Sequence, residues 1–187
     1  MPASLTGTYR AMARNNAWAN HRLLATCAGL SQQEFEAERV SFFPSIKATL
    51  NHILTIDWFY VDALEGGWLG PNAWADENPC ATVADLRREQ AAVDARLIAH
   101  CDALTDAALD EIVRVNRDTR VQTERRDRLL LHLFQHDIHH RGQVHAMLSG
   151  TGVAPPQLDE FYAAGEAPLR AAEFAALGWS EATVWDR

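Results

Sequence analysis

Histidines recur at helical spacing in the segment LLLHLFQHDIHHRGQVHAML, residues 129–148. Three of them are four residues apart and form one column on a helix: His132, His136 and His140. His139 and Gln143 lie beside this column. The same side of the helix carries an apolar stripe of the kind that packs into a core, formed by Leu129, Leu133, Val144 and Met147. We therefore expect the histidines to point into the protein.

Several inward imidazoles need partners, because a buried polar ring that lacks a hydrogen bond, an ion pair or a cation costs free energy. A shared divalent metal ion would satisfy them together, and histidines at positions i and i+4 of a helix are a known ligand geometry. Such pairs also occur by chance among hydrogen-bonded core histidines. This helix alone leaves both interpretations open, and a third ligand from another element would favour the metal.

The best third ligand is His52. It lies in an expected helix that starts at Pro44, which needs no N–H partner in a first turn, and that ends before Gly66 and Gly67. The neighbours that precede it on the same face are small: Ser45, Ala48 and Thr49. Small neighbours leave space beside an inward histidine, as a site requires and a tightly packed core does not.

Three imidazole nitrogens with an open position are typical of catalytic zinc sites, whereas closed structural sites use four protein ligands. Imidazole also binds nickel, iron, cobalt and copper, so the ligand type does not select the metal. Other sites are excluded by spacing. The run HDIHH lacks the Glu of HExxH proteases, and no ExxH pair of di-iron bundles, GxSxG elbow or phosphate-binding glycine loop occurs. No general base is evident.

Four long helices are expected to hold these residues. The first covers residues 4–30 and carries Asn16 and Asn20 within its apolar stripe, where they either bond to neighbouring helices or face a polar pocket. The third covers residues 82–104. The histidine helix is the fourth, and its second apolar side is formed by Leu131, Phe134 and Ile138. Because a helix that is apolar on two sides is buried on both, the final segments or a second subunit must cover this side, and we expect a homodimer.

The remaining segments are shorter. Residues 109–124 alternate polar and apolar side chains, which predicts a short β-like hairpin before the fourth helix. The Gly- and Pro-rich stretch 66–81 predicts a loop whose two tryptophans form a rim or lid, or simply cover one end of the helices. After the histidine helix, two prolines are expected to open a short helix over residues 155–162, and residues 169–177 can form another.

The composition is that of an ordinary globular protein, with 48% hydrophobic and 22% charged residues among 187, and we expect a single domain over residues 1–187. The net charge of −8 argues against a nucleic-acid partner, and acidic residues interrupt the basic stretch 114–128, as on a solvated face. Three cysteines without a CxxC motif favour free thiols. Since no signal-type run or membrane-spanning stretch is visible, we expect a cytoplasmic protein without a membrane partner.

Four blocks of the sequence resemble the DinB-like family of metal-binding helical bundles: ARNNAWANHRLL, NHILTIDWFYV, HDIHHRGQVHAML and PPQLDEFY. The HxxxHRGQ run is the hallmark of that family, and the blocks occur in the family's order over nearly the whole chain. The resemblance implies an all-α fold, an up-down-down-up four-helix bundle that is often dimeric, with short C-terminal helices here. It also implies one divalent metal ion on His52, His136 and His140, whereas His132 and His139 lie beside the motif and are not implied as ligands.

Characterised members of this family include thiol-dependent transferases and isomerases. The resemblance therefore implies a metal-dependent enzyme, a thiol S-transferase or hydrolase, that uses zinc or nickel first among the possible metals and a low-molecular-weight thiol as a further cofactor for a small-molecule substrate. The alternative is a stress-response or binding protein without turnover, whose metal is structural. A metal-free bundle with hydrogen-bonded histidines is the third interpretation. Neither a catalytic residue nor a residue that binds an organic cofactor is predicted.

Overall fold

Side-chain caps set where three of the long helices begin. Ser4, Ser45 and Thr82 each accept a hydrogen bond from the backbone N–H three residues further on. Each cap satisfies an amide that has no partner inside the helix, which is why serine and threonine favour this position. The helices that follow are α1 (Leu5–Cys27), α3 (Ile46–Leu64) and α4 (Val83–Asp102). The fourth long helix, α6 (Arg126–Leu148), follows a β-strand directly and has no side-chain cap.

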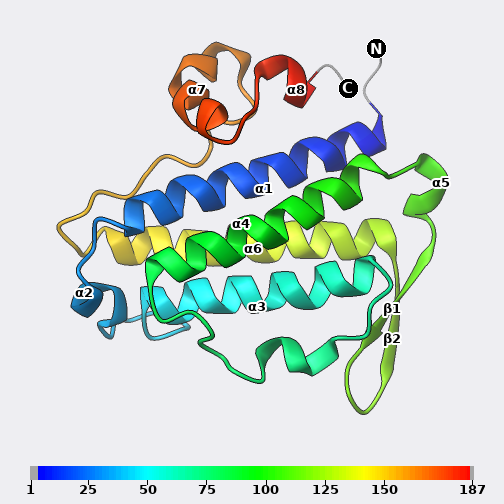
Figure 1. Cartoon of the computed structure of the whole chain (residues 1–187), viewed down its shortest axis with the longest axis horizontal. Helices are drawn as coiled ribbons and strands as arrows, with labels where there is room; N and C mark the ends of the chain where they lie inside the picture. The colour runs from blue at the N-terminus through cyan, green and yellow to red at the C-terminus, as the bar shows by residue number, and fades with distance from the viewer. Residues whose placement is uncertain (1–3, 186–187) are drawn as a thin grey trace.

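The computed structural model describes residues 4–185, and in it the four long helices lie side by side (Figure 1). Helix α1 contacts α4 and α6, and α3 contacts the same two helices. Each long helix buries leucines in one shared core, among them Leu23, Leu54, Leu97 and Leu133. The three cysteines are free and buried, as the sequence predicts. The fold is mostly helical with one two-stranded sheet, which agrees with the predicted all-α class.

The predicted hairpin is confirmed. Strands β1 (Ile112–Asn116) and β2 (Val121–Arg125) pair antiparallel, with Val113 opposite Glu124. Before α6, three short helical elements were not expected: α2 (Gln32–Glu36), η1 (Gly70–Trp74) and α5 (Asp106–Leu109). Helix α2 carried a sequence signal that was missed, because Ser31 and Glu34 form a capping box.

The C-terminal segment packs on α1 through a small core of its own. It contains η2 (Ala164–Glu166), α7 (Ala167–Ala176) and α8 (Glu181–Trp185). Its apolar cluster is separate from the main core and consists of Trp18, Ala19, Phe161, Phe174 and Val184. Arg22 of α1 adds ion pairs to Glu160 at 2.6 Å and to Glu173 at 2.8 Å. The segment is therefore held to α1 by both apolar and ionic contacts.

The short helix expected over residues 155–162 is wrong, because this stretch has no regular secondary structure. Proline lacks the N–H of a helical hydrogen bond and also disfavours the helical conformation of the residue before it, so Pro156 keeps Pro155 extended. The chain then runs irregularly and places Phe161 against Trp18, with ring centroids 5.6 Å apart. Helix α7 agrees with the helix expected over residues 169–177 within a few residues.

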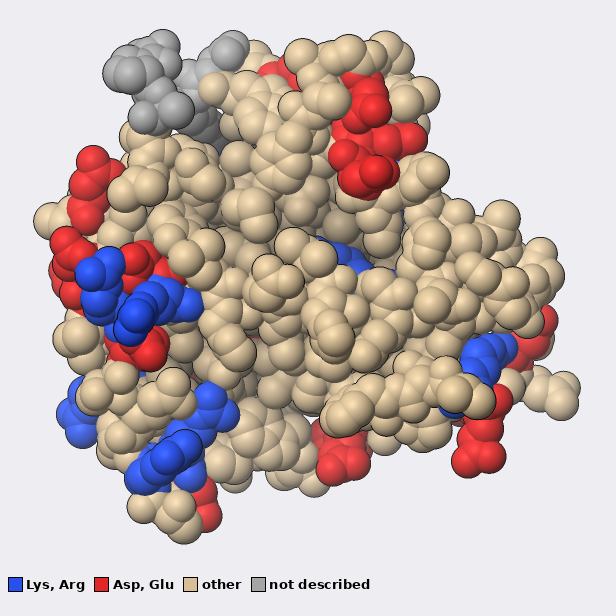
Figure 2. Space-filling model, turned by 180° about the vertical axis from the view of Figure 1, so that it is seen from behind, with Lys and Arg blue, Asp and Glu red and all other residues tan. Residues whose placement is uncertain are grey.

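The last arginines of the basic stretch 114–128 form ion pairs. Arg125 pairs with Asp110 and Asp127, and Arg126 pairs with Glu111. In Figure 2, basic and acidic side chains lie next to each other instead of forming a continuous basic face. Within residues 4–185, none of the helices combines the length and hydropathy that a membrane span needs.

Candidate metal centre

Three histidines from two neighbouring helices meet at one point. His52 comes from α3, and His136 and His140 come from successive turns of α6. One ring nitrogen from each lies within 4.8 Å of the other two. The Nε2 atoms of His52 and His136 are 3.0 Å apart. The helical spacing of His136 and His140 therefore places them where the packing of α3 on α6 brings a third imidazole.

This arrangement fits a divalent cation. Imidazole nitrogens bind zinc at 2.0–2.1 Å, so nitrogens that share one ion lie roughly 3 to 4 Å apart. The distance between the Nε2 atoms of His52 and His136 lies at the start of this range, so the three rings need to move little to share an ion. Burial, and to a lesser extent the neighbouring charges, lowers the pKa of His52 and His136 to about 4, and burial also lowers the pKa of His140. All three rings are neutral near pH 7, which is the form that binds a metal.

Two side-chain oxygens orient the rings of α6. Nδ1 of His136 lies 3.2 Å from Oδ1 of Asp137, and Nδ1 of His140 lies 2.8 Å from Oε1 of Gln143. An acceptor at Nδ1 keeps the ring proton on that atom and leaves the other nitrogen free for a cation. The sequence analysis named no such acceptor for the imidazoles. The signal that could have found Asp137 is an acidic residue directly after a histidine on a helix that is apolar on two sides.

His132 of the same column and its neighbour His139 are not part of the group of three. His132 is exposed, so the prediction that it points into the protein is wrong, and its ring packs against Tyr60, with ring centroids 5.3 Å apart. His139 is exposed, and its Nε2 lies 3.1 Å from the side-chain amide of Gln143. Shared spacing on a helix therefore distinguishes inward from outward histidines only in part, because the register against α3 decides which turn meets His52.

The two asparagines of α1 bond to neighbouring helices, which is the first of the alternatives left open by the sequence. The side-chain nitrogens of Asn16 and Asn20 donate to Oδ1 of Asp94 on α4 at 3.2 and 3.1 Å. Their side-chain oxygens accept from the guanidinium of Arg141 on α6. The two amides thus join a buried carboxyl group to a buried cation across three helices.

This polar network continues to the metal-site side of the bundle. Gln90 donates to Asp57 at 2.6 Å and to Asp94 at 3.3 Å. Burial raises the pKa of Asp57 and Asp137, and the two carboxyls lie close enough for one to donate a hydrogen bond to the other. Each of them also has one oxygen without any other partner. A proton held between Asp57 and Asp137 would satisfy both oxygens, and this pair ends at the ring of His136.

A cavity of about 290 Å³ opens beside His52. Of the small residues noted in the sequence, Ala48 lines it, whereas Ser45 and Thr49 are buried and do not. Thr55 also lines it. The ring of Phe43 lies over His52, with centroids 4.2 Å apart. Trp74 also lines the cavity, which places one of the two loop tryptophans at the rim.

Comparisons with known proteins identify the family. A model of the DinB family matches residues 1–170. The fold is similar to that in a crystal structure of a DinB-like protein from Bacillus cereus, with a TM-score of 0.59 and 16% sequence identity over 80% of this chain and 91% of the other. At that identity the likeness concerns the fold alone. A search of curated proteins finds no match.

Proposed function

Because the chain belongs to the DinB family, we propose that it is a metal-dependent enzyme of the thiol S-transferase or hydrolase type. One divalent cation, with zinc or nickel as the first choices, would be held by His52, His136 and His140. The observation that carries the proposal is the meeting of three neutral imidazoles beside a cavity that a substrate can enter. Three protein ligands leave a position for a reacting group, as in catalytic zinc sites.

The residues around the site have separable roles. Asp137 and Gln143 hold the rings of His136 and His140 in place. When bound, a divalent cation acidifies a thiol or water and polarises a substrate oxygen. Phe43 covers His52 on one side and limits the access of water to the ligand.

The cavity beside His52 suits a small electrophile with an apolar part. Phe43, Ile56 and Trp74 provide apolar walls, and Glu77 and Asn78 add polar groups to the lining. The volume of about 290 Å³ lies near the lower end of small-molecule sites. Substrate and low-molecular-weight thiol would therefore meet at the metal from this side.

A non-catalytic role is the alternative, and one observation favours it. The three ligands come from two helices, so a cation would cross-link α3 to α6 and stabilise their packing. In that case the protein would act as a stress-response or binding protein whose metal is structural.

The metal itself is tested by elemental analysis of protein purified without a His-tag and without added metal. We expect about one divalent ion per chain in the wild type and in His132→Ala, and little in His140→Ala. His132 is the matched control because it lies on the same helix two turns from His140 and outside the group of three. Equal metal content in the two variants would contradict the assignment of the site.

Catalysis is tested with a matrix of low-molecular-weight thiols and electrophiles. An enzyme would show turnover in the wild type and in His132→Ala, and a loss of at least a hundredfold in His136→Ala with the helical circular dichroism retained. Absence of turnover throughout, together with unfolding of the metal-depleted protein, would support the structural role instead.

We also infer that the four long helices form an up-down-down-up bundle within one domain. The colour gradient of Figure 1 supports this order, because it runs in one direction along α1 and α6 and in the opposite direction along α3 and α4.

We also propose a homodimer, since bundles of this family are often dimeric. Leu131 and Ile138 of α6 remain 55% and 46% exposed, and the back of the molecule, where α6 lies, carries few charged side chains across its centre (Figure 2). A second copy would cover these side chains.

A further inference from the structure

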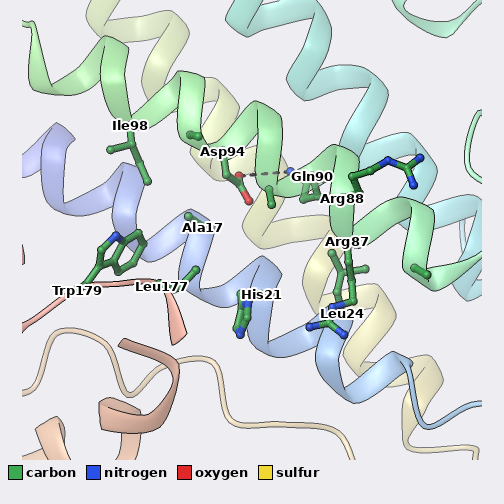
Figure 3. A pocket seen from close by; sticks show the side chains of 13 residues that line it. Ala17, His21, Leu24, Arg87, Arg88, Gln90, Asp94, Ile98, Leu177 and Trp179 are labelled. Atoms are coloured by element: carbon green, nitrogen blue, oxygen red, sulfur yellow. Dashed lines mark hydrogen bonds between the residues drawn. The ribbon is translucent and has the colours of Figure 1, made fainter. Parts of the chain in front are cut away.

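A second and larger cavity lies away from the histidines. It is a groove of about 660 Å³ between α1, α4 and the residues that join α7 to α8 (Figure 3). None of the three metal-site histidines lines it. Two of its lining residues, Leu177 and Trp179, lie beyond residue 170, where the match to the family model ends. This wall of the groove is therefore outside the part of the chain that the family accounts for.

The groove has two chemically different ends. Figure 3 shows Ile98 and Trp179 at one end and Arg87 with Leu24 at the other, with His21 projecting from α1. Leu177 joins Trp179 in the apolar wall. The volume falls within the range of about 300–1,000 Å³ that is typical of small-molecule sites. An occupant should therefore have an apolar body and one polar end.

The polar end contains an arginine without an acidic partner. Within residues 4–185, Arg87 forms no ion pair or hydrogen bond with an acidic side chain. Burial lowers the pKa of His21, and the nearby charge of Arg87 lowers it further, whereas Glu173, which pairs with Arg22, acts in the opposite direction. The adjacent Arg88 differs, because its guanidinium pairs with Asp85 and Glu89 and turns away from the groove in Figure 3. An unpaired guanidinium next to an imidazole N–H donor favours an anion.

The one carboxyl group in the lining does not neutralise this end. Asp94 lies at the floor, and its oxygens accept hydrogen bonds from Asn16, Asn20 and Gln90. Its side chain is buried and belongs to the network inside the bundle. Arg87 therefore remains available to a ligand.

We propose that this groove binds a small organic anion, with its carboxylate or sulfonate at Arg87 and His21 and its aromatic or aliphatic body against Ile98, Leu177 and Trp179. This site contains none of the three metal-site histidines and does not rest on the proposed reaction. The occupant should be one small molecule that reaches both ends, because the charged end and the apolar end lie within the same groove.

The test compares two fluorescent probes that share one apolar body. The probe 8-anilinonaphthalene-1-sulfonate carries one negative charge, and N-phenyl-1-naphthylamine has the same rings without the sulfonate. The metal-free and metal-loaded wild type should each bind the sulfonate at one saturable site per chain. The neutral probe should bind less tightly, because it cannot use Arg87.

Three variants locate the site. In Arg87→Gln we expect the affinity for the sulfonate to fall about tenfold while that for the neutral probe stays unchanged. In Arg96→Gln, the matched control at an arginine of α4 that pairs with Glu65 and does not line the groove, both affinities should stay within about twofold of the wild type. Ala91 lines the groove and is exposed on α4, so Ala91→Phe should fill the space and abolish binding of both probes without unfolding the helix.

Binding of the sulfonate that is equal in wild type, Arg87→Gln and Ala91→Phe would overturn the proposal, as would equal affinity of the wild type for both probes. Conversion of a wild-type dimer into a monomer by Ala91→Phe would also overturn it, because the groove would then be an interface between copies of the chain. Thermal unfolding followed by circular dichroism excludes variants that bind the dye through a partly unfolded state.

Discussion

Oδ1 of Asp137 lies 3.2 Å from Nδ1 of His136, and the Asp137 side chain is completely buried. The carboxyl group that orients this imidazole is also the end of a polar network that reaches Asp94 on α4 through Asp57 and Gln90. The proposed metal centre and the interior of the bundle are therefore parts of one hydrogen-bonded arrangement. The predictions below test its members one at a time.

Asp137→Asn should weaken metal binding. The amide keeps the shape of the side chain but is a weaker hydrogen-bond acceptor for the Nδ1–H of His136, and loss of such a partner usually lowers metal affinity by about 10 to 100-fold. Competition with a chromogenic chelator measures the effect. Asp57→Asn is the control, since Asp57 belongs to the same network but forms no hydrogen bond with the imidazoles, and its effect should stay within about threefold. Equal losses in the two variants would rule out a specific role of Asp137.

Arg141→Met should destabilise the fold. Arg141 is buried, donates to Asn16 and Asn20, and lowers the pKa of the three buried carboxyl groups. Removal of one partner from a buried charged network costs about 3 to 5 kcal/mol. We expect a loss of that size in urea unfolding. Arg128→Met, at an exposed arginine of the same helix, should cost less than about 1 kcal/mol.

The stability of the metal-free protein should contain a pH-dependent contribution from Asp94. Burial, reinforced by the charge of Asp57, raises the pKa of Asp94 from 3.8 to about 7. Between these values the folded protein keeps a proton that the unfolded chain has lost, so this contribution to the free energy of unfolding falls as the pH rises from about 4 to about 7. Asp94→Asn mimics the protonated acid and does not titrate.

The measurement is the free energy of unfolding of Asp94→Asn minus that of the wild type, in urea with a chelator present. This difference should rise by roughly 4 kcal/mol from pH 4 to pH 7 and then level off. Asp85→Asn is the control. The hydrogen bond from Thr82 and the contact with Arg88 lower the pKa of Asp85, so its difference should be flat over the same range. A flat profile for Asp94→Asn would show that this carboxyl is ionised in the folded protein.

The mass in solution should be that of two subunits. Leu131 is 55% exposed on α6, and Leu131→Glu places a charge where a second copy would pack, so it should yield monomers by light scattering. Leu169→Glu, at a similarly exposed leucine of α7, should leave the mass unchanged. A wild-type protein with the mass of one subunit would contradict the dimer.

The sequence was sufficient for the long helices and for the grouping of candidate ligands, because both depend on local periodicity. Residues four apart on α6 share a face in any packing, and the family motif separates His136 and His140 from His132. The capping serines and threonine also act locally. The long helices occur in the order that the periodicity predicts, and the chain matches the family model.

The remainder depends on contacts between distant segments. No local rule shows that Asp137 faces Asp57, or that Gln90 of α4 joins them, because each residue alone reads as an ordinary helical position. The helix predicted after Pro155 rested on the preference of proline for the first turn of a helix. Instead, two consecutive prolines prevent a helix there, and the contact of Phe161 with Trp18 fixes where the chain lies. The sequence likewise does not show that Arg87 lies in a groove, because residues of α1 and of the segment after α7 form its other walls.

The separate apolar cluster under α7 and α8 has a consequence for how the groove is entered. Because this cluster is separate from the main core and includes Trp18 and Ala19 of α1, detaching the C-terminal segment would cost less than opening the four long helices. Amide hydrogens of α7 should accordingly exchange with solvent faster than those of α3 or α6. Since Leu177 and Trp179 pack against this cluster, detachment of the segment would open one wall of the groove and leave the metal ligands in place.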